Sequence, residues 1–133
     1  MDAEGIVCSQ THVPTALRYG EELTIANPNF LNVVRSIEAS KILGAKYIIV
    51  HALKIPDDVK DEDFTSYNLA FYKLLEPYCQ QFGIQIAVEN LFSPDPLRRS
   101  FKGVLASPES LNTFIKELIR HALLPAWMWD MPP

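Results

Sequence analysis

Apolar residues in this chain form short continuous runs that are separated by stretches with a helical period. The runs cover residues 5–10, 47–50 and 83–89, and they contain β-branched residues. Such runs are typical of strands that are buried on both faces of a parallel sheet. The last run ends abruptly on a carboxylate and a carboxamide, Glu89 and Asn90. A charge where a strand leaves the core is costly unless it is paired, hydrated or bound to metal, so Glu89 is the first candidate for a functional residue.

Three other stretches have the period of an amphipathic helix. They cover residues 30–43, residues 64–82 and a segment that begins after Ser107, which can act as an N-cap before Pro108. Their expected buried faces consist of Phe30, Val33, Val34 and Ile37; of Phe71, Leu74, Leu75, Tyr78 and Phe82; and of Leu111, Phe114, Ile115 and Leu118.

Residues that begin, bend or end helices support these bounds. Asn27 or Asn29 can cap the first helix, and Gly44 is expected to end it in the left-handed conformation. Pro77 lies inside the second helix, where we expect it to kink the helix or to end its first half. The acidic residues of segment 57–63 are expected to form a solvated loop before that helix.

The order of the expected elements is β-α-β-α-β-α, which predicts an α/β fold with a parallel sheet. One unit of the repeat is about 40 residues long, as in a (β/α) barrel or a doubly wound sheet. No Gly-x-Gly-x-x-Gly or Gly-x-x-x-x-Gly-Lys motif follows any expected strand, so the usual signs of a nucleotide-binding fold are missing.

His12, His51 and Glu89 each stand at the carboxyl end of a successive expected strand. The carboxyl ends of parallel strands share one edge of the sheet, so the three side chains should meet in one crevice. Taken singly, each has an ordinary structural explanation: a loop residue, a core histidine and an acid that starts a loop. Together they favour a shared site. Two imidazoles and a carboxylate suit a divalent metal such as zinc or manganese, and they also suit proton transfer next to a carbonyl.

Length, charge and cysteine usage limit the possible classes of protein. The chain has 133 residues, enough for one domain with a sizeable core, and its net charge is -4 with no block of basic residues. Binding to nucleic acid through a basic face is therefore disfavoured. No apolar run is long enough to span a membrane, and the first residues lack the pattern of a signal peptide. Cys8 and Cys79 fit no metal or redox spacing, so we expect two reduced, buried thiols in a cytoplasmic protein.

Three segments together resemble a known family. They are residues 5–14, which end in Thr-His-Val-Pro; residues 36–51, which end in Tyr-Ile-Ile-Val-His; and residues 86–90, Ile-Ala-Val-Glu-Asn. They are similar to the xylose isomerase-like TIM barrels, and most of all to the sugar phosphate isomerase/epimerase group. The similarity covers nearly the whole chain up to about Leu118.

The resemblance implies a partial (β/α) TIM barrel of about three β/α units over residues 1–120, and metal-dependent proton transfer on a ketose or aldose. Glu89 would match a metal-binding glutamate that also takes part in proton transfer, and His51 would share the catalytic role. His12 and Asn90 would contact the sugar or sugar phosphate, and both histidines would line the metal pocket. The implied cofactor is Mn, Zn, Mg or Co.

Two residues depart from the family pattern, and other functions stay open. The family usually has Pro after the second histidine and Phe after His-x-Pro, where this chain has Ala52 and Thr15. These departures weaken the substrate assignment more than the fold.

One alternative is an endonuclease-like metal hydrolase on the same barrel, because related apurinic endonucleases bind zinc through histidines at such strand ends. The acidic charge of this chain disfavours it. Another alternative is a remnant without enzymatic activity.

The final segment, residues 121–133, has no apolar period and contains Trp127 and Trp129. When the codons inferred for this segment are read in a frame shifted by one base, they encode Asp-Val-Gly-(His or Tyr)-Ala. This sequence resembles the Asp-x-Gly-His motif of the family's next strand. We therefore expect a frameshifted tail in which Asp130 does not replace a ligand. Because a complete barrel needs about 250 residues, we expect a fragment that binds metal weakly at best and has little or no isomerase activity. We also expect it to self-associate through exposed sheet edges and through an apolar patch of side chains that would face the barrel interior, Ile48, Val50, Ile86 and Val88.

Overall fold

The computed structural model describes residues 5–53, 60–90, 105 and 107–121. These residues form strands and helices in strict alternation. The elements are β1 (Gln10–His12), α1 (Pro28–Ile42), β2 (Tyr47–His51), α2 (Asp61–Phe82), β3 (Gln85–Glu89) and α3 (Pro108–His121). The strands are parallel and lie in the order β1-β2-β3. The predicted α/β class with a parallel sheet is confirmed.

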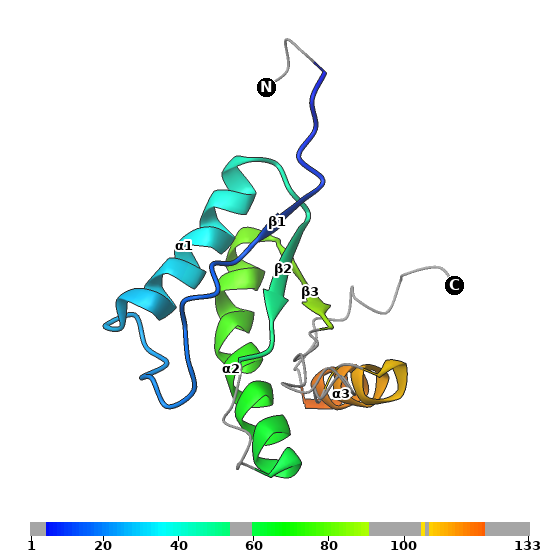
Figure 1. The fold of residues 1–133 in the computed structure, drawn as a ribbon. Helices are drawn as coiled ribbons and strands as arrows, with labels where there is room; N and C mark the ends of the chain where they lie inside the picture. Colours follow the sequence, from blue (N-terminus) through cyan, green and yellow to red (C-terminus); the bar gives the residue numbers. More distant parts are fainter. Residues whose placement is uncertain (1–4, 54–59, 91–104, 106, 122–133) are drawn as a thin grey trace, which may run out of the picture.

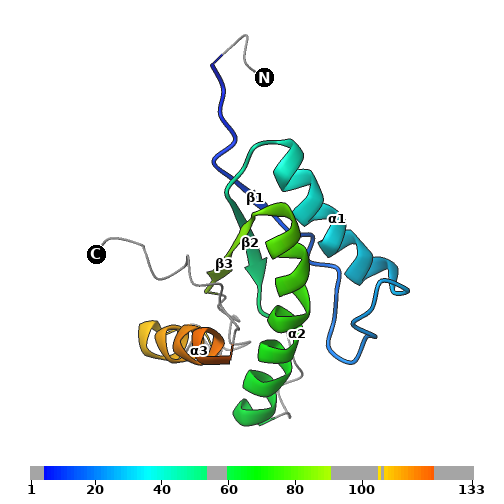
Figure 2. The ribbon, with the colours of Figure 1, turned by 180° about the vertical axis from the view of Figure 1, so that it is seen from behind.

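Helices α1 and α2 lie side by side on one face of the sheet (Figures 1 and 2). Helix α3 lies beyond the arrowhead of β3 and packs against α2 (Figure 1). Within the described ranges, no helix covers the opposite face of the sheet, which we call the open face. Side chains alternate between the two faces along each strand. Ile48 and Val50 of β2 are fully buried on the helix side, whereas Tyr47 and His51 belong to the open face.

Strand β1 begins later than the sequence predicted. Its residues pair with residues 47–49 of β2, whereas residues 5–9 pair with no other described strand. The backbone N–H and C=O groups of a strand need hydrogen-bond partners on a neighbouring strand. Gln10 already pairs with Tyr47, the first residue of β2, so β2 has no residues that could pair with residues 5–9. The predicted strand over residues 5–10 is therefore wrong except at Gln10. Cys8 is only partly buried, so the prediction of two buried thiols holds for Cys79 alone.

Helix α1 begins and ends at the predicted signals. The side chain of Asn27 accepts a hydrogen bond from the backbone N–H of Asn29 at 2.8 Å, which makes Asn27 the N-cap. Gly44 has a φ of 75°, and its N–H donates to the carbonyl of Lys41. The next N–H, of Ala45, donates to the carbonyl of Ser40, which completes a left-handed helix end. Thr11 of β1 contacts the buried Ser40 hydroxyl, so α1 also anchors the first strand.

Helix α2 is longer than predicted at its start and continues through Pro77. Residues 61–63 form its first turn, so the prediction that they belong to a solvated loop is wrong. Acidic side chains are favourable there because the amino end of a helix carries partial positive charge. The expectation that Pro77 ends the first half of the helix is wrong too, while a kink stays a prediction. Leu74 is 44% exposed rather than buried, because Leu75 takes the core position.

Helix α3 starts as predicted. The Ser107 hydroxyl accepts a hydrogen bond from the backbone N–H of Ser110 at 3.1 Å, and Pro108 is the first helical residue. Phe114 is buried against the core, and the helix extends to His121, one residue beyond the predicted boundary. Residues 122–133, with the predicted frameshifted tail, lie outside the described residues, as do Asp57 and Asp58. None of the helices in the described segments has both the length and the apolar character that crossing a membrane requires.

Candidate metal centre

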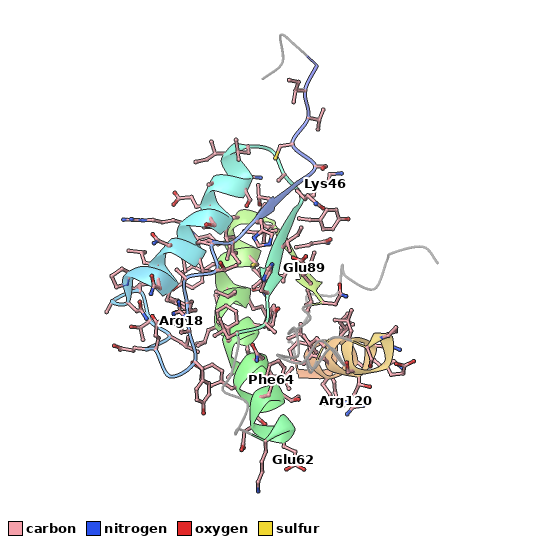
Figure 3. The ribbon with its side chains drawn as sticks, viewed as in Figure 1. Arg18, Lys46, Glu62, Phe64, Glu89 and Arg120 are labelled. Carbon is pink, nitrogen blue, oxygen red and sulfur yellow. The ribbon has the colours of Figure 1, made fainter. Side chains whose placement is uncertain are left out.

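The last residues of the three strands form one cluster. β1 ends at His12, β2 at His51 and β3 at Glu89. In the sheet register His51 is the partner of Glu89, while His12 is the partner of Ile49, two residues before His51 on the same face. All three side chains therefore lie on the open face, where Figure 3 labels Glu89. The structure brings together the three residues that the sequence placed at one edge of the sheet.

The ligand atoms of the cluster lie within 4.8 Å of one another. The Nε2 atoms of His12 and His51 are 2.6 Å apart. Glu89 Oε2 lies 2.8 Å from Nε2 of His51 and 3.3 Å from Nε2 of His12. The side chains of His12 and Glu89 are each 42% exposed and that of His51 is 20% exposed, so the site is open to a small molecule from solvent.

A backbone contact fixes the orientation of the His12 ring. Its Nδ1 lies 2.6 Å from the carbonyl oxygen of Val13, an acceptor that cannot donate. Nδ1 must therefore carry the proton of that hydrogen bond, and in the neutral ring Nε2 then has a free lone pair. Metal-binding histidines typically show this arrangement, with the second ring N–H held by a carbonyl or carboxylate. The lone pair of His12 Nε2 points toward His51 and Glu89.

The donor set fits a divalent transition metal. Two imidazole nitrogens and one carboxylate oxygen form one of the three-ligand sets of catalytic zinc sites. With metal–ligand bonds of about 2.0–2.2 Å, two ligand atoms in a tetrahedral site lie roughly 3.3 Å apart. The separation between His12 Nε2 and Glu89 Oε2 has this value. The two imidazole nitrogens would have to move apart by less than about 1 Å to hold an ion together.

Asn90, the fourth residue singled out by the sequence, follows β3 directly and is exposed. Its side chain forms no hydrogen bond with another described residue, and its role in substrate binding stays a prediction. A hollow of about 500 Å³ lies beside the cluster, between the end of β1 and helix α1. His12, Pro14 and Arg35 are among the residues that line it, whereas His51 and Glu89 are not, so the hollow meets the cluster only at His12.

Two residues of α2 lie behind the cluster and were not singled out by the sequence analysis. Tyr72 and Asn68 are buried and hydrogen-bond to the backbone around His51. Burial raises the pKa of the Tyr72 hydroxyl, which keeps it a hydrogen-bond donor. A signal was present for Asn68, because it interrupts the apolar stripe that runs from Phe64 to Leu75 on this helix. A polar residue in such a stripe needs a buried partner.

Comparison of the chain with protein families, with curated proteins and with solved structures gives no match. The similarity to xylose isomerase-like barrels therefore remains a prediction from short motifs.

Proposed function

We propose that His12, His51 and Glu89 bind one divalent metal ion and that the protein is a metal-dependent isomerase or epimerase. This proposal departs from the expectation of weak binding and little activity in a fragment, because the three converging side chains already form one of the ligand sets of catalytic zinc sites. The observation that carries the proposal is the convergence of three ligand atoms from three strand ends within 4.8 Å. The hydrogen bond from His12 Nδ1 to the Val13 carbonyl supports it, because it leaves a lone pair directed at the other two ligands. His12 Nε2, His51 Nε2 and Glu89 Oε2 would hold the ion.

We also propose that the sheet is part of a (β/α) TIM barrel. Both crossover helices, α1 and α2, lie on the same face of the sheet, and the strand order follows the chain order (Figure 2). In a doubly wound sheet the strand order reverses at one point and helices cover both faces. In a barrel every helix lies outside, and the strand ends carry the active site. The arrangement of the described elements agrees with the barrel and also with one half of a doubly wound sheet, so the preference for the barrel rests on the motifs in residues 5–14, 36–51 and 86–90.

The proposed reaction moves a proton on a sugar. A bound metal ion would polarise the carbonyl of the substrate as a Lewis acid. Glu89 uses Oε2 toward the imidazoles, and its Oε1 forms no hydrogen bond with another residue of the described segments. We assign Oε1 to take a proton from the carbon next to the carbonyl. Return of the proton to the former carbonyl carbon, with transfer of the hydroxyl proton from one oxygen to the other, gives an isomer. An epimer forms when a second acid delivers a proton to the opposite face of the carbon that Glu89 deprotonated.

His51 has two possible roles that exclude each other at one atom. The proposed metal site uses the Nε2 lone pair of His51 to hold the ion, which leaves no N–H at that nitrogen to donate a proton to the substrate. The substrate we propose is a ketose or aldose, or its phosphate. The reacting carbons would lie over Glu89 on the open face, and the hollow that begins at His12 would receive an anionic end of the substrate near Arg35. The net charge of -4 disfavours a nucleic acid in this role.

Metal binding is the first test. Titration of the purified chain with zinc, cobalt and manganese should show one site per chain, with manganese the weakest of the three ions. Glu89→Gln should weaken binding strongly, whereas Glu38→Gln, which changes an exposed glutamate of α1, should leave it unchanged. Absence of binding in the wild type, or equal effects of the two variants, would overturn the metal site.

Proton transfer is the second test. The metal-loaded chain is incubated in D₂O with ketopentoses, ketohexoses and their phosphate esters, and NMR follows the replacement of C–H by C–D next to the carbonyl. The proposal predicts exchange that requires metal and is lost in Glu89→Gln. Metal binding without exchange on any of these sugars would leave the metal site intact and overturn the isomerase assignment.

A further inference from the structure

We propose that Tyr72 and Asn68 of helix α2 are positioning residues for His51, because they hold the backbone of β2 on both sides of it. The consequence for metal affinity depends on the proposed metal site, whereas the consequence for the arrangement of the rings does not. Neither side chain reaches the cluster itself. Both act through the main chain that carries one of its members.

Tyr72 holds the strand just before His51. Its hydroxyl donates a hydrogen bond of 2.8 Å to the carbonyl oxygen of Val50. The side chain is 2% exposed and packs between the rings of Phe71 and Phe114, with centroid distances of 5.5 and 5.8 Å. A ring confined in this way has little freedom, so the hydroxyl fixes the position of the Val50 carbonyl relative to α2.

Asn68 holds the chain just after His51. Its Oδ1 accepts a hydrogen bond of 2.6 Å from the Leu53 N–H, and its Nδ2 donates to the Leu53 carbonyl at 3.2 Å. The second amide proton of Asn68 is donated to the Phe64 carbonyl, also at 3.2 Å. The residue is fully buried. Asn68 therefore satisfies both the N–H and the carbonyl of Leu53, as a neighbouring strand would, although Leu53 lies beyond the end of β2.

The two anchors leave His51 little room to move. Only His51 and Ala52 lie between the Val50 carbonyl and the Leu53 N–H that α2 holds. The pairing of β2 with β3 ends at His51, which is opposite Glu89. The sheet therefore provides no hydrogen-bond partners for the backbone after His51. Buried backbone groups at such a point need partners, and α2 supplies them. Small displacements matter, because the His51 nitrogen must meet two other atoms that come from different strands.

The first measurement needs no metal. The rings of His12 and His51 have centroids 4.5 Å apart, so their protons should give a nuclear Overhauser contact in the metal-free protein. Tyr72→Phe removes only one hydroxyl and keeps the ring in the core, and it should weaken this contact. Tyr67→Phe is the matched control. The Tyr67 hydroxyl, on the same helix, accepts a hydrogen bond from the Gly20 N–H rather than bonding to β2. This variant should leave the contact unchanged.

The second measurement is zinc affinity. We expect Tyr72→Phe to lower it about tenfold, the lower end of the range for residues that support metal ligands, and Tyr67→Phe to leave it unchanged. Asn68→Leu should lower it at least as much; if that variant does not fold, Tyr72→Phe alone decides. A ring contact in Tyr72→Phe as strong as in the wild type and in Tyr67→Phe would overturn the positioning role. A wild type that shows the ring contact, loses it in Tyr72→Phe and binds no zinc would overturn the proposed function and support the positioning role.

Discussion

The Nε2 atoms of His12 and His51 lie 2.6 Å apart, although 39 positions separate the two residues in the chain. Two ring nitrogens at this distance need one proton between them, because two lone pairs would repel and two N–H groups would collide. The Val13 carbonyl already accepts the Nδ1 proton of His12. In the neutral, metal-free site the shared proton therefore belongs to His51, and His12 Nε2 accepts it.

The protonation pattern can be observed directly. We predict that nitrogen chemical shifts of the metal-free protein, at a pH where both rings are neutral, show the proton of His12 on Nδ1 and that of His51 on Nε2. The reason is that the hydrogen bond made by one ring nitrogen decides which nitrogen is protonated. Glu89→Gln should leave the pattern of His12 unchanged. A His12 ring protonated on Nε2 would contradict the inferred direction of the lone pair.

The two faces of β2 should differ in their contribution to stability. Ile48 is fully buried under the helices, whereas Ile49, its neighbour, lies on the open face and is only partly buried. We predict that Ile48→Ala lowers the free energy of unfolding by about 2–5 kcal/mol, and that Ile49→Ala lowers it clearly less. Urea unfolding of both variants measures the difference. Equal losses would show that the open face is packed as tightly as the helix side.

That assignment corrects one expectation from the sequence. We expected Ile48, Val50, Ile86 and Val88 to face a barrel interior and to lie exposed without it. Instead Ile48 and Val50 are fully buried against α1 and α2, with Ile86 and Val88 packed at the edge of the same core. A run of apolar residues shows that both faces of a strand avoid water, but it does not show which face the helices cover.

The ends of the strands could be predicted better than their beginnings. A change from apolar residues to His51 or Glu89 is visible in the sequence, and the structure ends β2 and β3 at these residues. The start of β1 depends on where β2 offers a partner, which no local pattern contains. The Asn68 and Tyr72 contacts with β2 were missed for the same reason, since they join residues 15 and 22 positions apart through the packing of α2.

The two cysteines should differ in reactivity. Burial raises the pKa of Cys79 to about 12, with the negative charge of Glu76 as a second cause. The thiolate is the reactive form, so Cys79 should not react with iodoacetamide at pH 8 while the protein is folded. Cys8 is partly exposed and should be alkylated first. Mass spectrometry of peptides over time measures both rates, and a Cys79 that reacts as fast as Cys8 would mean that its site opens readily.

The outer edge of β1 should promote self-association. No described strand pairs with this edge, and Val7, which precedes β1, is 83% exposed. Unpaired edges bind other edges unless a charge blocks them. We predict that light scattering at micromolar concentration detects oligomers and that Val7→Lys shifts them toward monomer. Ile25→Lys is the control, because Ile25 is also exposed but lies in the loop before α1. A wild type that stays monomeric would refute the prediction.

Glu21 organises the loop between β1 and α1. Its Oε2 accepts hydrogen bonds from the side-chain amides of Asn27 and Asn29, at 3.0 and 2.9 Å, and its Oε1 accepts from the Arg18 N–H at 2.9 Å. The bond from Asn27, followed by that from Asn29, lowers the pKa of this carboxyl below its ordinary value. Asn27 is also the N-cap of α1, so the carboxylate supports the start of that helix.

The sign of the pH effect follows from the lowered pKa of Glu21. A carboxyl with a lower pKa in the folded than in the unfolded chain stabilises the fold above the unfolded value, and this contribution is lost as pH falls through the folded value. Glu21→Gln, which cannot offer a charged acceptor to both asparagines, should therefore lower the melting temperature near neutral pH. The difference from wild type should shrink as the solution is acidified below pH 5. Glu22→Gln, a change at an adjacent exposed carboxyl, should lower the melting temperature little at any pH. A difference between wild type and Glu21→Gln that stays constant down to the lowest pH at which the protein is folded would mean that the charge of Glu21 does not hold this loop.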